Sequence, residues 1–308
     1  MVSNDGSTQP GSRGGAYLVC AVVTIAFGTM AVKQALADGS DPREVMVTGQ
    51  LLAGALAAVF LPRALMGLPR RLLLMALVAS AGLAVTNAAA FEALDRLPAG
   101  IVVVLVFCSP IWVAIGQPLF LRSPIGRREG VGAVLVLIGI LTMVGSVDPS
   151  LDLTGVALGV ASSIGFAVFL LGTKPLDGVG SGAGSAALVL PFTGLISLAL
   201  WPAAGVNGVS ELPGTPYVLF VGVAVCVWAV LLAAGLRRTT PMTTVVVSAL
   251  EPALVTIMSY LFFSEGLRAR ELVGGSLVLL GALLAMLQDA RGAYPERAPA
   301  PREASSAL

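Results

Sequence analysis

The sequence contains no histidine and few charged, aromatic or cysteine residues. Only 11% of its 308 residues are charged and 6% are aromatic. The lack of histidine excludes Ser-His-Asp and Cys-His catalysis and zinc sites with histidine ligands. Cys20, Cys108 and Cys226 lie far apart in apolar stretches without a CxxC motif, so neither a disulfide framework nor a cysteine metal site is expected. The balance of 18 basic and 17 acidic residues predicts no surface for nucleic acid.

Apolar residues dominate what remains. They make up 56% of the chain, and the mean hydropathy is +0.93. A soluble domain carries about 25% charged residues, whereas a membrane-crossing helix needs about 20 mostly apolar ones. We therefore predict an all-α membrane protein. Ten transmembrane helices are expected over residues 16–36, 44–62, 72–93, 98–120, 130–147, 153–172, 184–203, 215–236, 241–263 and 271–288.

The basic residues are distributed unevenly between alternate loops. If the N-terminus is cytoplasmic, the cytoplasmic segments hold 13 Lys and Arg residues, the outer loops hold 4, and Lys33 lies within a span. Because positive residues mark the cytoplasmic side, we predict a multi-pass plasma-membrane protein with both termini in the cytoplasm. Residues 1–15 and 289–308, which are polar or proline-rich, are expected to be disordered cytoplasmic tails.

Spans four and five are similar in sequence to spans nine and ten. Aligning Pro110 with Pro252 also aligns Glu129 with Glu271 and two pairs of glycines, without a gap. The repeat unit is then five spans, and the two units cover residues 16–147 and 148–288. Because five is odd, the second unit enters the membrane from the opposite face. The prediction is two five-helix repeats of inverted topology, which many secondary transporters build around a midplane site.

The two aligned prolines lie near the middle of their spans. A proline removes one helical hydrogen bond and strains the preceding turn, and a carbonyl freed in hydrocarbon must face protein, water or ligand. Two interpretations remain open: Pro110 and Pro252 kink their helices for packing, or they are hinges beside a site. On the second interpretation, Ser109 and Ser248 are candidate substrate-binding residues.

Two charged residues lie within predicted spans, where a charge costs about 2.5–3.5 kcal/mol on insertion scales. Glu251 directly precedes Pro252. We expect it either to face a cavity, where it binds a substrate amine or exchanges a proton, or to fix the kinked helix through a hydrogen bond. Lys33 lies about one turn from the outer end of span one. It either snorkels to the interface or faces inward and neutralises a substrate carboxylate or an acidic group.

Uncharged polar residues within spans also need partners. Asn87 is deep in span three, where its amide contacts either neighbouring helices or substrate. Trp112, one turn beyond Ser109, is either a packing residue or a substrate contact. Glu129 and Glu271 each begin a helix, where an acid complements the helix dipole, and this explains them without a functional role.

Several short motifs occur in a fixed order along the chain. They are Asn87, Arg96-Leu97-Pro98-Ala99-Gly100-Ile101, Ser109-Pro110, Asp152-Leu153-Thr154-Gly155, and Glu251-Pro252-Ala253-Leu254 followed by Ser264-Glu265. Over residues 16–288 the chain thereby resembles the EamA-type drug/metabolite transporter family, and most of all its bacterial threonine/homoserine exporters. The resemblance implies ten helices in two inverted halves, a central cavity and export of small metabolites such as amino acids. Gln50 and Phe91 stand where these exporters carry an arginine and a tyrosine.

The residues bear on three classes of function. The first is a secondary transporter that exports amino acids such as threonine or homoserine, with a drug, nucleobase or other small molecule as the alternative substrate. An intramembrane enzyme would need a carboxylate dyad, for which Glu251 and Glu92 are the candidates. A scaffold would have a cavity without polar lining. Because the chain has no P-loop, direct ATP drive is not expected.

We therefore predict a transporter rather than an enzyme. It is expected to bind a small-molecule substrate and to lie in the lipid bilayer. No cofactor or metal is expected. A proton is the candidate coupling ion, with Glu251 as the group that would carry it.

Overall fold

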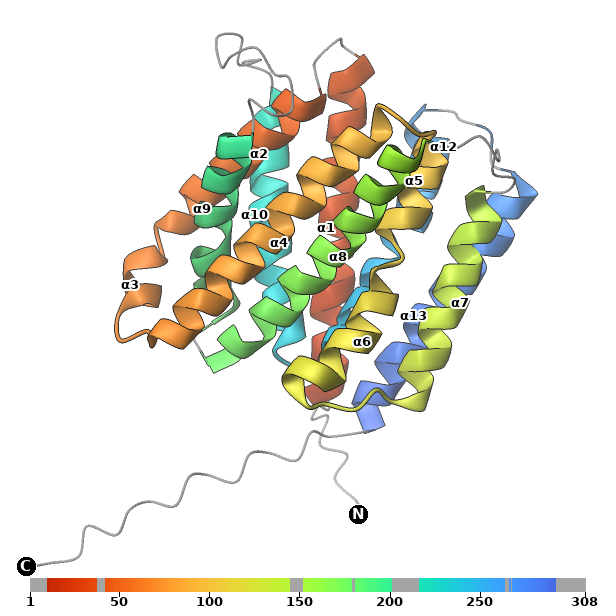
Figure 1. The fold of residues 1–308 in the computed structure, drawn as a ribbon. Helices are drawn as coiled ribbons and strands as arrows, with labels where there is room; N and C mark the ends of the chain where they lie inside the picture. The colour runs from red at the N-terminus through yellow and green to blue at the C-terminus, as the bar shows by residue number, and fades with distance from the viewer. Residues whose placement is uncertain are drawn as a thin grey trace, which may run out of the picture.

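The computed structural model of the chain is a bundle of long helices. It describes residues 10–37, 42–144, 152–178, 181–200, 216–263, 266 and 268–291. Eight helices in this part of the chain are long and apolar enough to cross a membrane, and Glu44–Ala58 is a shorter apolar helix. The long helices run between the same two ends of the molecule (Figure 1). The predicted all-α membrane class is confirmed at this level, while the count of ten spans stays a prediction.

The helices follow the predicted spans closely. Those of the first half are α1 (Pro10–Ala37), α2 (Pro42–Ala58), α3 (Leu61–Leu65), α4 (Arg70–Leu94), α5 (Ala99–Val106), α6 (Ser109–Leu121) and α7 (Arg127–Val144). Those of the second half are α8 (Leu153–Thr173), the 3-10 helix η1 (Lys174–Gly178), α9 (Gly182–Leu200), α10 (Pro216–Leu236), α11 (Pro241–Ser248), α12 (Glu251–Phe263) and α13 (Ala269–Arg291).

The two predicted tails are shorter than expected. α1 begins at Pro10 and α13 ends at Arg291, so residues 10–15 and 289–291, which we expected to be disordered, are helical. Residues 1–9 and 292–308 lie outside the described part of the chain. Gly14 packs closely against Thr239 and Gly15 against Met286, and composition alone does not register such contacts.

Predicted spans four and nine are each interrupted near the middle. Two residues separate α5 from α6, and two separate α11 from α12. We expected Pro110 and Pro252 inside continuous helices, but each is the second residue of the helix that follows the break. A proline is well tolerated in the first turn because its missing N–H is not needed there. The chain therefore ends one helix and begins another.

The helices of the two halves pack in a reciprocal pattern. α1 packs on α10 and α4 packs on α8, while α2 packs on α9 and α7 on α13. Let α1 correspond to α8, α2 to α9, α4 to α10 and α7 to α13. Exchanging the two halves then turns the α1–α10 pair into the α4–α8 pair. The α2–α9 and α7–α13 pairs are each unchanged by the exchange. Such a pattern is expected of two structurally related halves.

α7 and α13 approach each other closely at two pairs of glycines. A Cβ added to Gly132 would lie 2.6 Å from the carbonyl oxygen of Gly281, and one added to Gly139 would lie 2.6 Å from that of Gly274. Only glycine fits at such distances. Because Gly132 aligns with Gly274 and Gly139 with Gly281, the two contacts are one contact repeated by the relation between the halves. The aligned glycines thus specify the crossing of these two helices.

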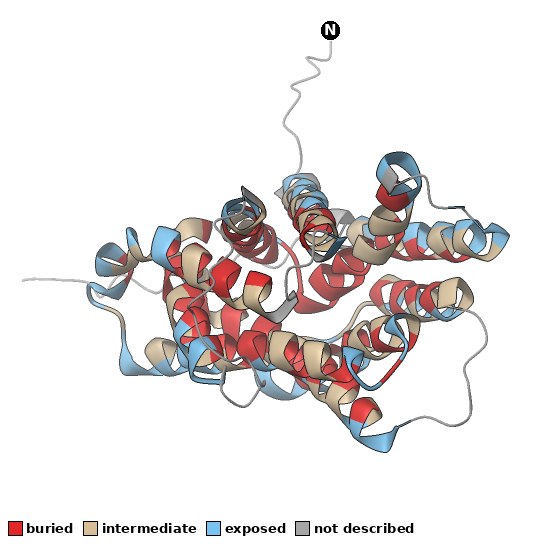
Figure 2. Cartoon of the chain, turned by 90° about the horizontal axis from the view of Figure 1, so that it is seen from above, coloured by how far each residue is buried: buried red, intermediate tan, exposed pale blue. Residues whose placement is uncertain are grey.

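Large apolar side chains cover the outside of the bundle. Leu119, Phe120, Leu261 and Phe262 are each between 66% and 73% exposed. Buried residues lie toward the interior, where the helices face one another (Figure 2). An apolar outer surface of this kind is a liability in water, but it suits contact with lipid chains.

Candidate binding cavity

A cavity with a volume of about 230 Å³ lies between the two halves. Its lining comes from α1, α2, α4 and the α5/α6 break of the first half, and from α8, α9, α10 and the α11/α12 break of the second. Within the described part of the chain, α7 and α13 contribute no lining residue. Phe107, Ser109, Ser248 and Glu251 all line it, so the two helix breaks meet at this cavity.

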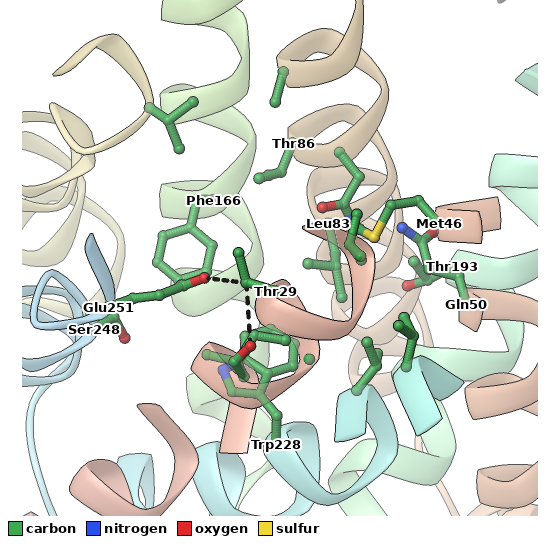
Figure 3. Close-up of a pocket in the computed structure, with 18 of the residues that line it drawn as sticks. Thr29, Met46, Gln50, Leu83, Thr86, Phe166, Thr193, Trp228, Ser248 and Glu251 are labelled. Carbon is green, nitrogen blue, oxygen red and sulfur yellow. Dashed lines mark hydrogen bonds between the residues drawn. The ribbon is translucent and has the colours of Figure 1, made fainter. Parts of the chain in front are cut away.

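Glu251 brings a carboxylate into the cavity lining. It is the first residue of α12, so the break before it fixes its position. Its Oε1 accepts a hydrogen bond from Thr29 Oγ1 of α1 at 3.0 Å (Figure 3). The first turn of a helix is also where an acidic side chain is electrostatically favoured. Two elements, the start of α12 and the middle of α1, therefore hold this carboxylate.

Three further predicted residues line the cavity. They are Asn87 on α4, Ser109 at the start of α6 and Ser248 at the end of α11. Ser109 is only 1% exposed. Within the described residues, no hydrogen bond is recorded for the side chains of Asn87 and Ser109. Both therefore present polar groups that a bound molecule can satisfy.

The other two predicted contacts join helices outside the lining. Lys33 Nζ donates to Ser259 Oγ of α12 at 3.0 Å, and Trp112 Nε1 donates to Ser163 Oγ of α8 at 2.9 Å. Neither residue is among those that line the cavity. The structure thus brings together four of the six predicted binding residues and places Lys33 and Trp112 between helices.

Several hydroxyl groups of the lining were not predicted. Thr86 and Thr193 line the cavity, and each donates to the carbonyl four residues earlier, at 2.8 and 3.0 Å. Threonines are common in membrane helices, and no sequence pattern separates these two from the others. Thr29 was also missed, although it lies one turn before Lys33 on the same face of α1.

The remaining polar and aromatic residues of the lining lie on two opposite sides of the cavity. Gln50 of α2 is 4% exposed, and its Oε1 accepts from Ser197 Oγ at 2.5 Å. Figure 3 shows Glu251, Ser248 and Phe166 on one side of the pocket, with Gln50, Met46 and Thr193 on the other. The aromatic residues of the lining are Phe107, Phe166 and Trp228. Phe169 lies behind them, with its ring centroid 5.8 Å from those of both Phe166 and Trp228.

The cavity lies nearer to one end of the bundle. On α4 its lining runs from Leu83 to Ala90, close to the end of that helix, and on α10 it runs from Val221 to Trp228, close to the beginning. α4 ends where α10 begins, at the upper end of Figure 1. α1 begins and α13 ends at the opposite end.

A buried polar cluster joins the halves at that opposite end. It consists of Gln117, Glu129, Thr240, Met242 and Thr243, and we name it the closed-end cluster. The Glu129 carboxylate is 1% exposed and accepts hydrogen bonds from the hydroxyls of Thr240 and Thr243, the latter at 3.0 Å. Gln117 Oε1 accepts the backbone N–H of Met242 at 2.8 Å. α6 and α7 are thereby tied to the start of α11.

The helix-dipole explanation of Glu129 proves incomplete. Glu129 accepts the N–H of Gly126 at 2.6 Å, and its aligned counterpart Glu271 accepts that of Arg268 at 2.9 Å, as an acid in a first turn should. Glu129 also bonds to α11, more than 100 residues later in the chain. This second role was missed because the threonines that complete it belong to the other half.

The comparisons with known proteins agree with this architecture. The EamA-like transporter family matches residues 12–145 and again residues 153–287, once in each half. Protein PecM of Dickeya dadantii (strain 3937) is 24% identical over 212 residues, which cover 65% of this chain and 68% of PecM. An uncharacterized transporter of Archaeoglobus fulgidus is 26% identical over 221 residues, which cover 66% and 74% of the two chains.

A solved crystal structure of a protein only 16% identical shares the fold. It superposes with a TM-score of 0.70 over 90% of this chain and 96% of that one. The two family matches span nearly all of the described helices and divide the chain where the predicted repeats divide it. The chain therefore belongs to the EamA-like transporter family.

Proposed function

We propose that this membrane transporter exports small metabolites that carry an amine, by alternating access around the cavity. The observation that supports this most directly is the Glu251 carboxylate, which lines the cavity and bonds to α1. An ionisable group inside a membrane bundle is costly, and it marks a functional site by default. A substrate amine is the complementary partner for a carboxylate, because hydrogen bonds between charged groups are the strongest kind.

The proposed topology has ten spans in two inverted five-helix repeats in the plasma membrane, with both termini in the cytoplasm. The reciprocal helix packing and the family match in each half support it. α2, which is short, and α7, whose first three residues are charged, would be the second and fifth spans. The distribution of basic residues then puts the closed-end cluster on the cytoplasmic side and the cavity nearer the outside.

Alternating access would move the inner segments of spans four and nine. Gln117 lies on α6 and Met242 on α11, and their hydrogen bond joins these two segments at the cytoplasmic end. Pro110 and Pro252 lie at the breaks that separate each inner segment from its outer one. We propose that these breaks act as hinges and that separation of the closed-end cluster opens the cavity to the cytoplasm.

Amino acids such as threonine and homoserine are the substrates implied by the sequence resemblance. Their amine would bind Glu251, and their hydroxyl would bind Asn87 or Ser109. Drugs, nucleobases and other small metabolites are the alternative. A scaffold is disfavoured because the cavity has a polar lining, and an enzyme is disfavoured because Glu92 is not among the lining residues that accompany Glu251. A proton exchanged at Glu251 is the proposed coupling ion.

Loss of labelled threonine from preloaded proteoliposomes tests this function. The loss is followed with and without an imposed proton gradient, while unlabelled amino acids, nucleobases and cationic drugs compete. We expect loss faster than from protein-free vesicles, and we expect Glu251→Gln to abolish the effect of the gradient. Glu271→Gln is the matched control, because this acid caps its own helix. If no compound in the panel leaves or competes, the proposed function is wrong.

A further inference from the structure

The charge of the cavity lining is unbalanced. Glu251 contributes a carboxylate, while no lysine or arginine of the described residues is among those that line the cavity. Lys33, which on one of its two interpretations would neutralise a substrate carboxylate, donates to Ser259 on α12. Gln50, on the wall opposite Glu251, is uncharged and accepts from Ser197. A bound molecule therefore meets one negative charge and no positive side chain.

The helix start at the first break offers little to an anion. An anion at a helix N-terminus is held by open backbone N–H groups. At the start of α6, Pro110 has no N–H, and the N–H of Ile111 already donates to the carbonyl of Cys108 at 3.0 Å. The equivalent helix start in the second half carries Glu251 itself. Neither break thus supplies a cation, and among the first three residues of α6 only Ser109 keeps a backbone N–H without a backbone acceptor in the described part of the chain.

The rest of the lining suits a cation with an apolar body. Phe107, Phe166 and Trp228 line the cavity with aromatic rings, and Phe169 packs against the rings of Phe166 and Trp228. Aromatic faces attract ammonium groups as well as apolar groups. Asn87 and Ser109 supply neutral donors and acceptors for a hydroxyl or an amide of the ligand.

From this lining we infer that the substrate is a singly charged amine on an apolar or aromatic body, without a carboxylate. The inference rests on the proposed function and narrows its substrate class. An amine neutralises Glu251 and leaves no charge unpaired in the cavity. An amino acid brings the same amine together with a carboxylate that finds no cation there, and burying an unpaired charge is strongly unfavourable. The inference thus departs from the threonine expectation.

Pairs of compounds that differ only at the carboxylate test the inference. Proteoliposomes are loaded with labelled tyramine or tyrosine, and with labelled threoninol or threonine, and initial efflux is corrected for protein-free vesicles. We expect each amine to leave at least about tenfold faster than its amino acid at equal concentration. If the amino acids leave as fast or faster, the inference is overturned and the transporter function stands. If none of the four compounds leaves above background, the inference is overturned, and the wider panel of amino acids, nucleobases and cationic drugs decides the transporter function.

Two variants, each with a control, separate the effect of charge in the cavity from the effect of its shape. Glu251→Gln should remove most of the preference for the amines, whereas Glu271→Gln, which changes an acid outside the cavity, should leave it intact. Gln50→Arg adds a cation to the lining and should reverse the preference toward the amino acids, while Gln50→Leu should not. Each variant is first shown to elute as the wild type does on gel filtration. A preference that survives Glu251→Gln in a folded protein overturns the inference.

Discussion

In the proposed topology the closed-end cluster faces the cytoplasm, and we predict that its buried carboxylate, Glu129, keeps that end of the bundle closed. We expect Glu129→Ala to open the cytoplasmic end, because the carboxylate is the acceptor that joins α7 to Thr240 and Thr243 of α11. Glu271→Ala is the control, since this residue occupies the aligned position and accepts from Arg268 close by in its own half. Only the first change removes hydrogen bonds between the halves.

The structure sets the size of the expected effect. A hydrogen bond to a charged group contributes about 1.5–3 kcal/mol net, so the two threonine bonds to Glu129 are worth about 3–6 kcal/mol. The Thr240 hydroxyl also lies 3.2 Å from that of Thr243, so the threonines retain one mutual bond and the lower end applies. At 1.4 kcal/mol per tenfold change, the ratio of closed to open cytoplasmic ends should fall by about a hundredfold.

Accessibility of a single cysteine at this end measures the shift. Met242, which is 2% exposed, is replaced by cysteine after Cys20, Cys108 and Cys226 are changed to alanine. The labelling rate with a membrane-impermeant maleimide is then measured from each side of oriented vesicles. We expect Glu129→Ala to raise labelling of Met242→Cys from the cytoplasmic side by at least about tenfold, and Glu271→Ala to leave it unchanged.

A double-mutant cycle decides whether the effect passes through the threonines. In a Thr243→Val background, Glu129→Ala should add less than it does alone, because their shared hydrogen bond is already missing. Labelling that does not respond to Glu129→Ala would refute the role of the cluster. Equal responses to Glu129→Ala and Glu271→Ala would show general loosening instead.

Three further predictions concern other parts of the bundle. Gly139→Leu should destabilise the protein by about 1–3 kcal/mol or more, because the larger side chain overpacks the α7–α13 crossing. Gly130→Leu, on an open face of α7, should have no such effect. Thermal unfolding in nanodiscs measures both. Trp112→Phe should leave transport kinetics nearly unchanged and lower the melting temperature, because the indole bonds to Ser163 rather than lining the cavity. Hydrogen bonds from the N–H groups that begin α8 lower the pKa of Asp152. The ionised side chain should therefore stabilise the protein at any pH above the ordinary pKa of aspartate, and this stabilisation should be lost as the pH falls through the lowered pKa. The difference in melting temperature between wild type and Asp152→Asn should accordingly shrink in acid.

The membrane class could be predicted from the sequence because a protein surrounded by lipid differs in composition from one surrounded by water, and the family could be predicted from short motifs. A chain with 11% charged residues cannot cover a soluble surface, and the aligned prolines, acids and glycines mark its halves. The two helix breaks could not be located in the same way. Apolar residues continue through both, so hydropathy does not register a turn of two residues. The prolines indicated where to look, but not that each would begin a new helix.

Which face of each helix meets the cavity was harder to predict than its ends. In a soluble protein the polar stripe shows the orientation of a helix, whereas here both the lipid side and the interior are apolar. A charge within a span has few places to go, and Glu251 lines the cavity, as one of its two interpretations expected. Lys33 donates to Ser259 on α12, a partner that sequence spacing does not show. Glu129 was undervalued because its position at a helix start already had a sufficient local explanation.

The proposed function depends on the differences between the two halves. In the proposed mechanism, the symmetric features, namely the paired breaks and the glycine crossing of α7 and α13, allow two related arrangements of the bundle. The asymmetric ones choose between them. Ser109 stands where the second half has Glu251, so the described residues give the cavity a single carboxylate, which a substrate with one amine would match. Upstream of the breaks, one inserted residue aligns Pro98 with Pro241, and Leu97 and Gly100 then stand where the second half has Thr240 and Thr243. The buried acid of α7 therefore has hydroxyl partners that its counterpart in α13 lacks among the described residues. In an arrangement where the starts of α5 and α13 meet, Thr at positions 97 and 100 would offer Glu271 the same partners. If the asymmetry sets the preferred state, this change should favour the cytoplasm-open arrangement that Glu129→Ala also favours. Labelling of Met242→Cys then reports on both changes, and a rise with Glu129→Ala but not with Leu97→Thr and Gly100→Thr together would show that the outer end is held by other contacts.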